Sequence, residues 1–187
     1  MIQDILEKQQ AFYVAGNTLD TRSRRAMLQI LANTIKDAAA DDPDTPGILA
    51  GIADIRKHLY KWSGTGRLRL LLSLFARPSG KGPIPLGNVL IDAGTARSLK
   101  EILQPLVCAL SAGDTAVVLL PDSPAGDTVR KIVDDTFTED FVATVPSGTE
   151  DGSGLNGKDF NFVYTCGSGL PAFGHEGFLA FSTASSE

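Results

Sequence analysis

The sequence of 187 residues lacks the features that mark several classes of protein. No apolar stretch approaches the roughly 20 residues needed to cross a bilayer, so we expect no membrane span. The first residues, MIQDILEKQQ, are polar, which argues against a secretory signal and favours a cytoplasmic location. Two cysteines are too few for a disulfide framework, and Cys108, in an apolar helical segment, is expected to be a small core residue.

Positive charge and metal-binding residues are also scarce. The formal net charge is −5, so we expect the molecule to bind neither nucleic acid nor a membrane surface. Only two histidines are present, and no spacing of Cys, His and carboxylates suits a metal. Eight Arg, Lys or His residues do occur between Asp54 and Asp92 without an acidic one. A solvated helix face is the simpler interpretation of this stripe, and phosphate or nucleic-acid binding is the alternative.

The sequence does contain a change in the spacing of its apolar residues near residue 80. Residues 1–40 and 48–62 carry apolar residues at helical spacing, separated by the break DDPDTPG. Asp20 or Thr21 can cap the second helix of this part. We therefore expect a helical segment over residues 1–80.

From Lys81 onward, short apolar runs alternate with helical segments. Helices are expected at 99–110 and 123–137, and strands are expected in NVLID, TAVVLL, FVATV and FNFVYT. This alternation is typical of βαβ units with a parallel sheet. The predicted class is α/β, with an α/β segment at 81–187 that forms one compact domain together with the N-terminal helices.

Five segments together carry a resemblance to a known family. In chain order they are YVAGNTLDTRSRRAMLQIL, PLGNVLI, PLVCALSAGDTAVVLLP, FTEDFVATVPSG and FNFVYTCGSG. They resemble the N-terminal helices and the cofactor domain of the aldehyde dehydrogenase family, closest to its short class 3-like branch, over roughly residues 10–170. The resemblance implies a Rossmann-like parallel sheet of aldehyde-dehydrogenase type, represented by a truncated portion without the catalytic domain.

The departures from the family concern its catalytic and cofactor groups. The family's first strand ends in a proline-tryptophan-asparagine loop whose asparagine holds the oxyanion, whereas this chain reads DAGTARS at 92–98. Leu120 stands where the family has a lysine that binds the adenine ribose, and Leu cannot make that charge-assisted hydrogen bond. Neither cysteine matches the family's nucleophile, and the general-base glutamate lies beyond the matched region. We therefore expect no bound cofactor and no nicotinamide-dependent oxidation.

Polar residues nevertheless follow the predicted strands. Open α/β sheets bind ligands beyond the carboxyl ends of their strands, so these side chains are the candidate site. They could position or protonate a small organic molecule, or they could be residues without a function that have changed by neutral drift at a solvent-exposed edge of the sheet. The candidate catalytic residues are Asp92, Asp122, Tyr164 and His175, and the candidate substrate-binding residues are Thr95, Arg97, Ser123 and Cys166.

Two functions remain open from the sequence. The first is non-redox chemistry, of the isomerase or cyclase type, on a small organic molecule in specialised metabolism. The second is a non-catalytic accessory role, in which the chain binds a full-length dehydrogenase or another larger pathway enzyme. The apolar edge of a partial sheet needs a cover, so we expect the tail LPAFGHEGFLAF to fold back as a strand, and we expect a homodimer.

Overall fold

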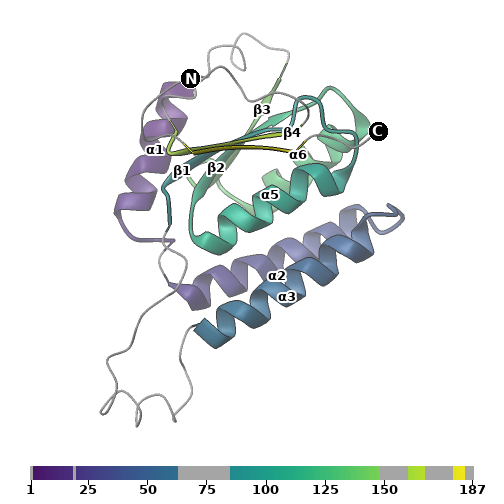
Figure 1. Ribbon diagram of the computed structural model, residues 1–187, viewed down its shortest axis with the longest axis horizontal. Coiled ribbons are helices and arrows are strands. Elements are labelled where there is room, and N and C mark those ends of the chain that lie inside the picture. The colour runs from purple at the N-terminus through teal and green to yellow at the C-terminus, as the bar shows by residue number, and fades with distance from the viewer. Residues whose placement is uncertain (1, 19, 63–84, 148–159, 167–178, 184–187) are drawn as a thin grey trace.

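The chain forms a parallel β-sheet with helices on both faces, which confirms the predicted α/β class (Figure 1). The computed structural model describes residues 2–18, 20–62, 85–147, 160–166 and 179–183. Its helices are α1 (Ile2–Val14), α2 (Thr21–Ala38), α3 (Thr45–Trp62), α5 (Leu99–Ala112) and α6 (Pro124–Thr136). Its strands are β1 (Asn88–Asp92), β2 (Thr115–Leu120), β3 (Val142–Pro146), β4 (Phe162–Cys166) and β5 (Leu179–Thr183).

The strand order of the sheet is β3-β2-β1-β4-β5, and every neighbouring pair is parallel. From β1 the chain moves outward through β2 to β3, and it then places β4 and β5 on the opposite side of β1. The direction of winding therefore reverses between β1 and β4. Ligands of open α/β sheets bind at such a reversal, so this place is where a site is expected.

Alternating side chains divide the core between the two faces of the sheet. Val89 and Ile91 join the large apolar cluster on the face that α5 and α6 cover, and α2 and α3 pack outside those two helices (Figure 1). Leu90 points to the opposite face, where it meets Leu6 of α1 and Val117 of β2. The N-terminal helices are therefore divided between the two sides of the sheet.

The helix starts follow local signals in the sequence. The Asp20 carboxylate accepts hydrogen bonds from the N–H groups of Arg22 and Ser23 and caps α2, as the sequence predicts. Ser123 caps α6 in the same way. Helix α3 starts at Thr45, earlier than expected, because Pro46 suits the first turn of a helix.

The tail supplies a fifth strand, as the sequence predicts for the segment 170–181. The strand is β5, whose first three residues belong to that segment, and it pairs parallel to β4 with Val163 opposite Ala180. Residues 170–178 of the predicted strand lie outside the described residues. This strand continues the sheet by one position and itself forms an edge.

A buried polar corner holds α5 against its surroundings. Gly113, with φ of 96°, ends the helix in the left-handed conformation. Arg24 of α2 is only 6% exposed and donates to the carbonyl oxygens of Ser111 and Ala112, at 3.2 and 2.9 Å. These contacts satisfy carbonyl groups that the end of a helix leaves unpaired.

We predict that Gly113→Ala lowers the free energy of unfolding by about 1–3 kcal/mol, because it requires an alanine at positive φ. The added Cβ would also lie 2.9 Å from the Thr18 carbonyl oxygen and 3.1 Å from the Arg24 guanidinium carbon. Gly51→Ala is the matched control, because a Cβ there meets nothing within 4 Å. That change should add about 0.5–1 kcal/mol of helix stability. Urea denaturation of both variants measures the difference, and equal stabilities would contradict the prediction.

Candidate functional site

The pairing of β1 with β4 brings several predicted site residues together at the carboxyl ends of these strands. Asp92 of β1 lies opposite Thr165 of β4. The Thr95 hydroxyl, in the loop after β1, donates a short hydrogen bond to the carbonyl oxygen of Cys166. The Cys166 thiol donates to the Glu101 carbonyl oxygen at 3.4 Å. The loop after β1, the end of β4 and the first turn of α5 are thus bound to one another.

Cys166 is not poised as a nucleophile in this arrangement. Burial, together with the negative charges of Glu101 and Asp92, raises the pKa of its thiol to about 11, despite a hydrogen bond with Tyr164 that lowers it. A thiol with this pKa is protonated at neutral pH, whereas attack requires the thiolate. The contacts of Cys166 join β4 to α5, which is a structural role.

The other predicted residues are separate from this cluster. Asp122 is exposed in the loop after β2. The Ser123 hydroxyl accepts a hydrogen bond from the Gly126 N–H at 3.2 Å, so it serves as the N-cap of α6. The Arg97 side chain is exposed, while its backbone N–H donates to a Glu101 carboxylate oxygen at 2.7 Å. His175 lies outside the described residues.

Leu120, at the end of β2, supplies no hydrogen-bonding side chain for a ligand. Its side chain is 0% exposed and belongs to the large apolar cluster between the sheet and the helices. This is the position at which the resembled family is expected to have a ribose-binding lysine. No amine reaches the strand ends from position 120, and the described residues therefore do not fit a nicotinamide dinucleotide in the way that family binds it.

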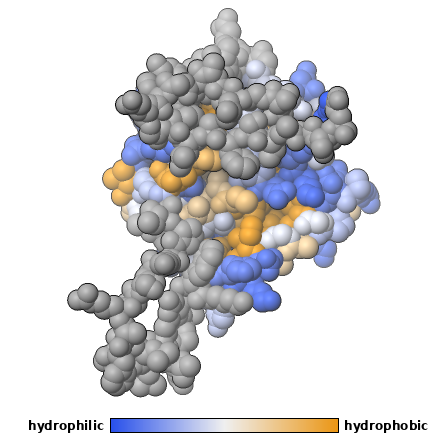
Figure 2. All heavy atoms as spheres, in the orientation of Figure 1, coloured by the Kyte–Doolittle hydropathy of each residue, from blue (hydrophilic) through white to orange (hydrophobic). Residues whose placement is uncertain are grey.

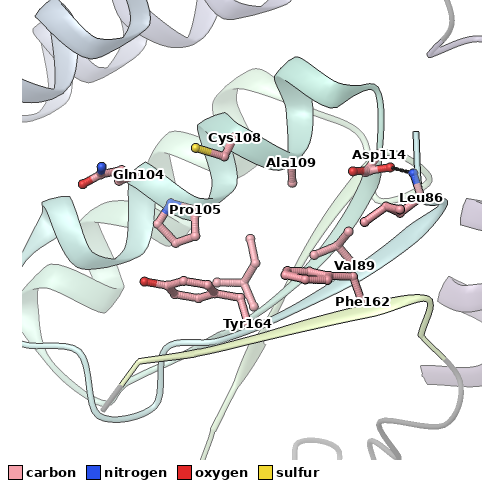
Figure 3. Close-up of a pocket in the computed structure, with 10 residues that line it drawn as sticks. Leu86, Val89, Gln104, Pro105, Cys108, Ala109, Asp114, Phe162 and Tyr164 are labelled. Carbon is pink, nitrogen blue, oxygen red and sulfur yellow. Dashed lines mark hydrogen bonds between the residues drawn. The ribbon is translucent and has the colours of Figure 1, made fainter. Parts of the chain in front are cut away.

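An apolar groove, absent from the sequence-based predictions, lies beside the reversal point of the sheet (Figure 3). We call it the α5 groove; it has a volume of about 500 Å³ and runs between α5 and strands β1 and β4. Helix α5 contacts β4 at Cys166 but leaves Phe162 and Tyr164 half-buried in the groove wall. The apolar lining residues are Leu86, Val89, Ile91, Pro105, Ala109 and Phe162.

The polar groups of the α5 groove lie towards its ends. Tyr164 and Gln104 lie near the start of α5, whereas Asp114 lies at the other end, beside Leu86 (Figure 3). Asp114 is only 3% exposed, and its Oδ1 accepts hydrogen bonds from the N–H groups of Leu86 and Gly87. Burial raises the pKa of Asp114, and those two bonds and the charge of Arg24 oppose the rise.

Cys108 corrects one expectation from the sequence. It is exposed rather than a core residue, because it lies on α5 where two surface hollows meet. Cys108 and Gln104, one helical turn apart, form a ridge between the α5 groove and a second hollow of about 130 Å³. Ile48 and Ile52 of α3 line this second hollow, and Figure 2 shows hydrophobic surface along α5 and towards α3.

Two other expectations concern ligands and membranes. Within the described residues, no group of three His, Cys, Asp or Glu side chains could hold a metal ion. None of the helices over the described ranges has the length and apolar character needed to cross a membrane.

Comparisons with known proteins find a similar sequence and similar structures. No protein-family profile matches the chain. It is 26% identical over 179 residues to 4,4'-diaponeurosporen-aldehyde dehydrogenase of Staphylococcus aureus (strain NCTC 8325 / PS 47), covering 84% of this chain and 39% of that enzyme.

Solved structures of the family show the same fold. The structure is similar to a substrate-bound Staphylococcus aureus AldH, with a TM-score of 0.69 and 24% identity over 90% of this chain and 41% of that chain. It is also similar to the glyceraldehyde-3-phosphate dehydrogenase GapN from Methanocaldococcus jannaschii complexed with NADP, with a TM-score of 0.50 and 18% identity, covering 89% and 41% of the two chains. The chain spans about two-fifths of the length of these relatives.

The two thiols should differ in reactivity. We predict that iodoacetamide at pH 8 modifies exposed Cys108 at least about tenfold faster than buried Cys166, as measured by peptide mass spectrometry. The thiolate fraction of Cys166 should rise about tenfold per pH unit until the pH reaches its pKa of about 11. Cys108→Ser is the control that isolates Cys166, and rapid labelling of this variant in the folded state at pH 8 would contradict the assignment.

Proposed function

From its homology to part of an aldehyde dehydrogenase, we propose that this protein binds a small, largely apolar organic molecule in the α5 groove and does not oxidise it with a nicotinamide cofactor. The observation that carries the proposal is the groove itself. It combines an apolar lining with a few polar groups near its ends, as is typical of small-molecule sites, and its volume of about 500 Å³ suits such a ligand.

The absence of dehydrogenase chemistry is supported by the groups at the strand ends. Aldehyde oxidation requires a thiolate nucleophile, donors for the oxyanion, a base and a bound nicotinamide. Among the described residues, Cys166 has a raised thiol pKa, Leu120 is buried, and the loop after β1 carries no asparagine side chain. Removing one oxyanion donor alone costs about 10²–10³ in rate. Several required groups are altered here at once.

The reaction class that we propose is a rearrangement, of the isomerase or cyclase type, in which no electrons leave the ligand. Such a reaction can depend on the shape of the site and on one group that donates a proton and takes it back. Tyr164 is the catalytic candidate, because it is the predicted site residue that lines the α5 groove. Asp92, Thr95 and Cys166 would position it by holding the ends of β1 and β4 in place.

An accessory role is the second candidate, and the ridge of Gln104 and Cys108 favours it. The ridge separates two apolar hollows on one side of the molecule, one against β4 and one against α3. A partner protein could cover both hollows at once. The partner would be a larger pathway enzyme or, as in the expected homodimer, a second copy of this chain.

The cofactor part of the proposal predicts no saturable binding of NADH or NADPH up to millimolar concentration. Isothermal titration measures this directly, with a full-length aldehyde dehydrogenase as the positive control. In a parallel assay, an aldehyde and NAD should give no increase of reduced nicotinamide absorbance. Micromolar binding, or steady formation of reduced nicotinamide, would overturn this part of the proposal.

The groove part of the proposal predicts binding of the neutral fluorescent probe N-phenylnaphthylamine. We expect Cys108→Trp, whose indole would occupy the groove, to weaken probe binding about tenfold or more. Cys108→Ala leaves the groove open and should bind within about twofold of the unchanged protein.

Equal probe binding by Cys108→Trp and Cys108→Ala would place the probe elsewhere and contradict the groove as the ligand site.

Size-exclusion chromatography with light scattering tests the accessory role. If the protein has that role, the unchanged protein should bind no probe, because a partner or a second copy covers the groove. Cys108→Trp should then release the partner or the second copy.

A further inference from the structure

We propose that the ligand of the α5 groove is an elongated apolar alcohol, whose hydroxyl group donates a hydrogen bond to Oδ2 of Asp114. This inference rests on the proposed function, because it names the ligand class of the same groove. It follows from one buried carboxylate and the apolar surface in front of it.

Asp114 presents an acceptor atom that the described residues leave unused. Its Oδ1 accepts from the N–H groups of Leu86 and Gly87, while Oδ2 has no hydrogen-bond donor among the described residues. Figure 3 shows this second oxygen on the side of the carboxylate that faces away from Leu86, towards the groove. Asp114 as a whole is only 3% exposed, and a carboxylate oxygen beside an apolar groove favours a donor, so a ligand that supplies one gains affinity at this end.

The charge around Asp114 indicates which kind of donor suits it. The guanidinium of Arg24 interacts with the carboxylate and opposes the increase in its pKa. Arg24 is itself buried and bound to the end of α5, so the positive charge is fixed in place. Because the carboxylate already has a cation beside it, a neutral hydroxyl suits Oδ2 better than an ammonium group does.

The rest of the groove specifies an elongated apolar body. Helix α5 continues for eight residues after Gln104, to Ala112, which corresponds to about 12 Å along a helix, and Asp114 lies just beyond its end. Between these ends the walls are formed by side chains such as Val89, Pro105 and Phe162, which offer no hydrogen bonds from their side chains. A medium-length alkyl or terpenoid alcohol has this shape and chemistry.

Displacement of N-phenylnaphthylamine by decanol and by decanal tests the inference. Both compounds have the same length, but only the alcohol donates a hydrogen bond. We expect decanol to displace the probe at concentrations about tenfold lower than decanal, the difference that one hydrogen bond to a charged group supplies. Decylamine, whose ammonium group would lie near Arg24, should be weaker than decanol.

Asp114→Asn is the variant that isolates the hydrogen bond. Its Oδ1 can keep the bonds from Leu86 and Gly87, while Nδ2 replaces the free acceptor by a donor. Both the alcohol and the aldehyde can accept a hydrogen bond from that donor, so the preference for decanol should disappear. Asp122→Asn makes the same chemical change at an exposed position outside the groove and should retain the preference.

Protection of Cys108 from iodoacetamide separates the possible outcomes, because Cys108 lines the groove. If decanol and decanal protect Cys108 equally in the unchanged protein, the groove binds apolar molecules but the Asp114 inference is wrong. If decylamine binds most tightly, the carboxylate acts as an uncompensated anion and the inference is also wrong. If neither compound protects Cys108 or displaces the probe, the proposed function itself fails. The comparison in the unchanged protein stands even if Asp114→Asn does not fold.

Discussion

The buried pair of Arg24 and Asp114 is the constraint on which the arrangement of helices and sheet depends. Arg24 comes from α2 and binds the last carbonyl groups of α5. Asp114 follows α5 directly and binds the backbone N–H groups of Leu86 and Gly87, just before β1. Two buried opposite charges that interact electrostatically need partners for their polar atoms, so each backbone contact fixes a segment of chain. The outer helical layer, α5 and the first strand are therefore held at one corner.

This corner also explains why a groove exists beside α5. The helix is fixed at its C-terminal end and covers β1 and β2, while the order of the strands places β4 on the far side of β1. Helix α5 reaches β4 at Cys166, and the side chains of Phe162 and Tyr164 stay half-buried. The groove is thus a consequence of the reversal in winding direction between β1 and β4.

Local patterns in the sequence were sufficient to predict the elements of the fold. Asp20 and Ser123 cap helices by hydrogen bonds to backbone N–H groups two or three residues further along the chain. A run of apolar residues such as TAVVLL predicts a buried strand without information from other parts of the sequence. Cys108 was wrongly expected in the core, because the apolar character of α5 as a whole conceals that one of its sides faces outward.

The α5 groove could not be predicted in the same way. It is formed by residues that lie far apart in the sequence, such as Leu86, Gln104 and Phe162, and it depends on the distance between α5 and β4. Asp114 reads as an ordinary turn residue after Ala112 and Gly113. Only the structure shows that one of its oxygens holds the backbone while the other faces an apolar surface.

The carboxyl ends of the strands and the α5 groove differ in how many of their polar side chains already make hydrogen bonds within the protein. At the carboxyl ends of the strands, the Ser123 hydroxyl caps α6, the Thr95 hydroxyl binds the Cys166 carbonyl, and an Asp92 oxygen accepts from the Gly94 N–H at 3.1 Å. A ligand that bound there would have to compete with these intramolecular hydrogen bonds. In the α5 groove, a ligand would meet Oδ2 of Asp114, which accepts no hydrogen bond from the described residues. A hydrogen bond that forms without breaking another contributes its full net free energy. This difference between the two places is the reason why we propose the α5 groove as the ligand site.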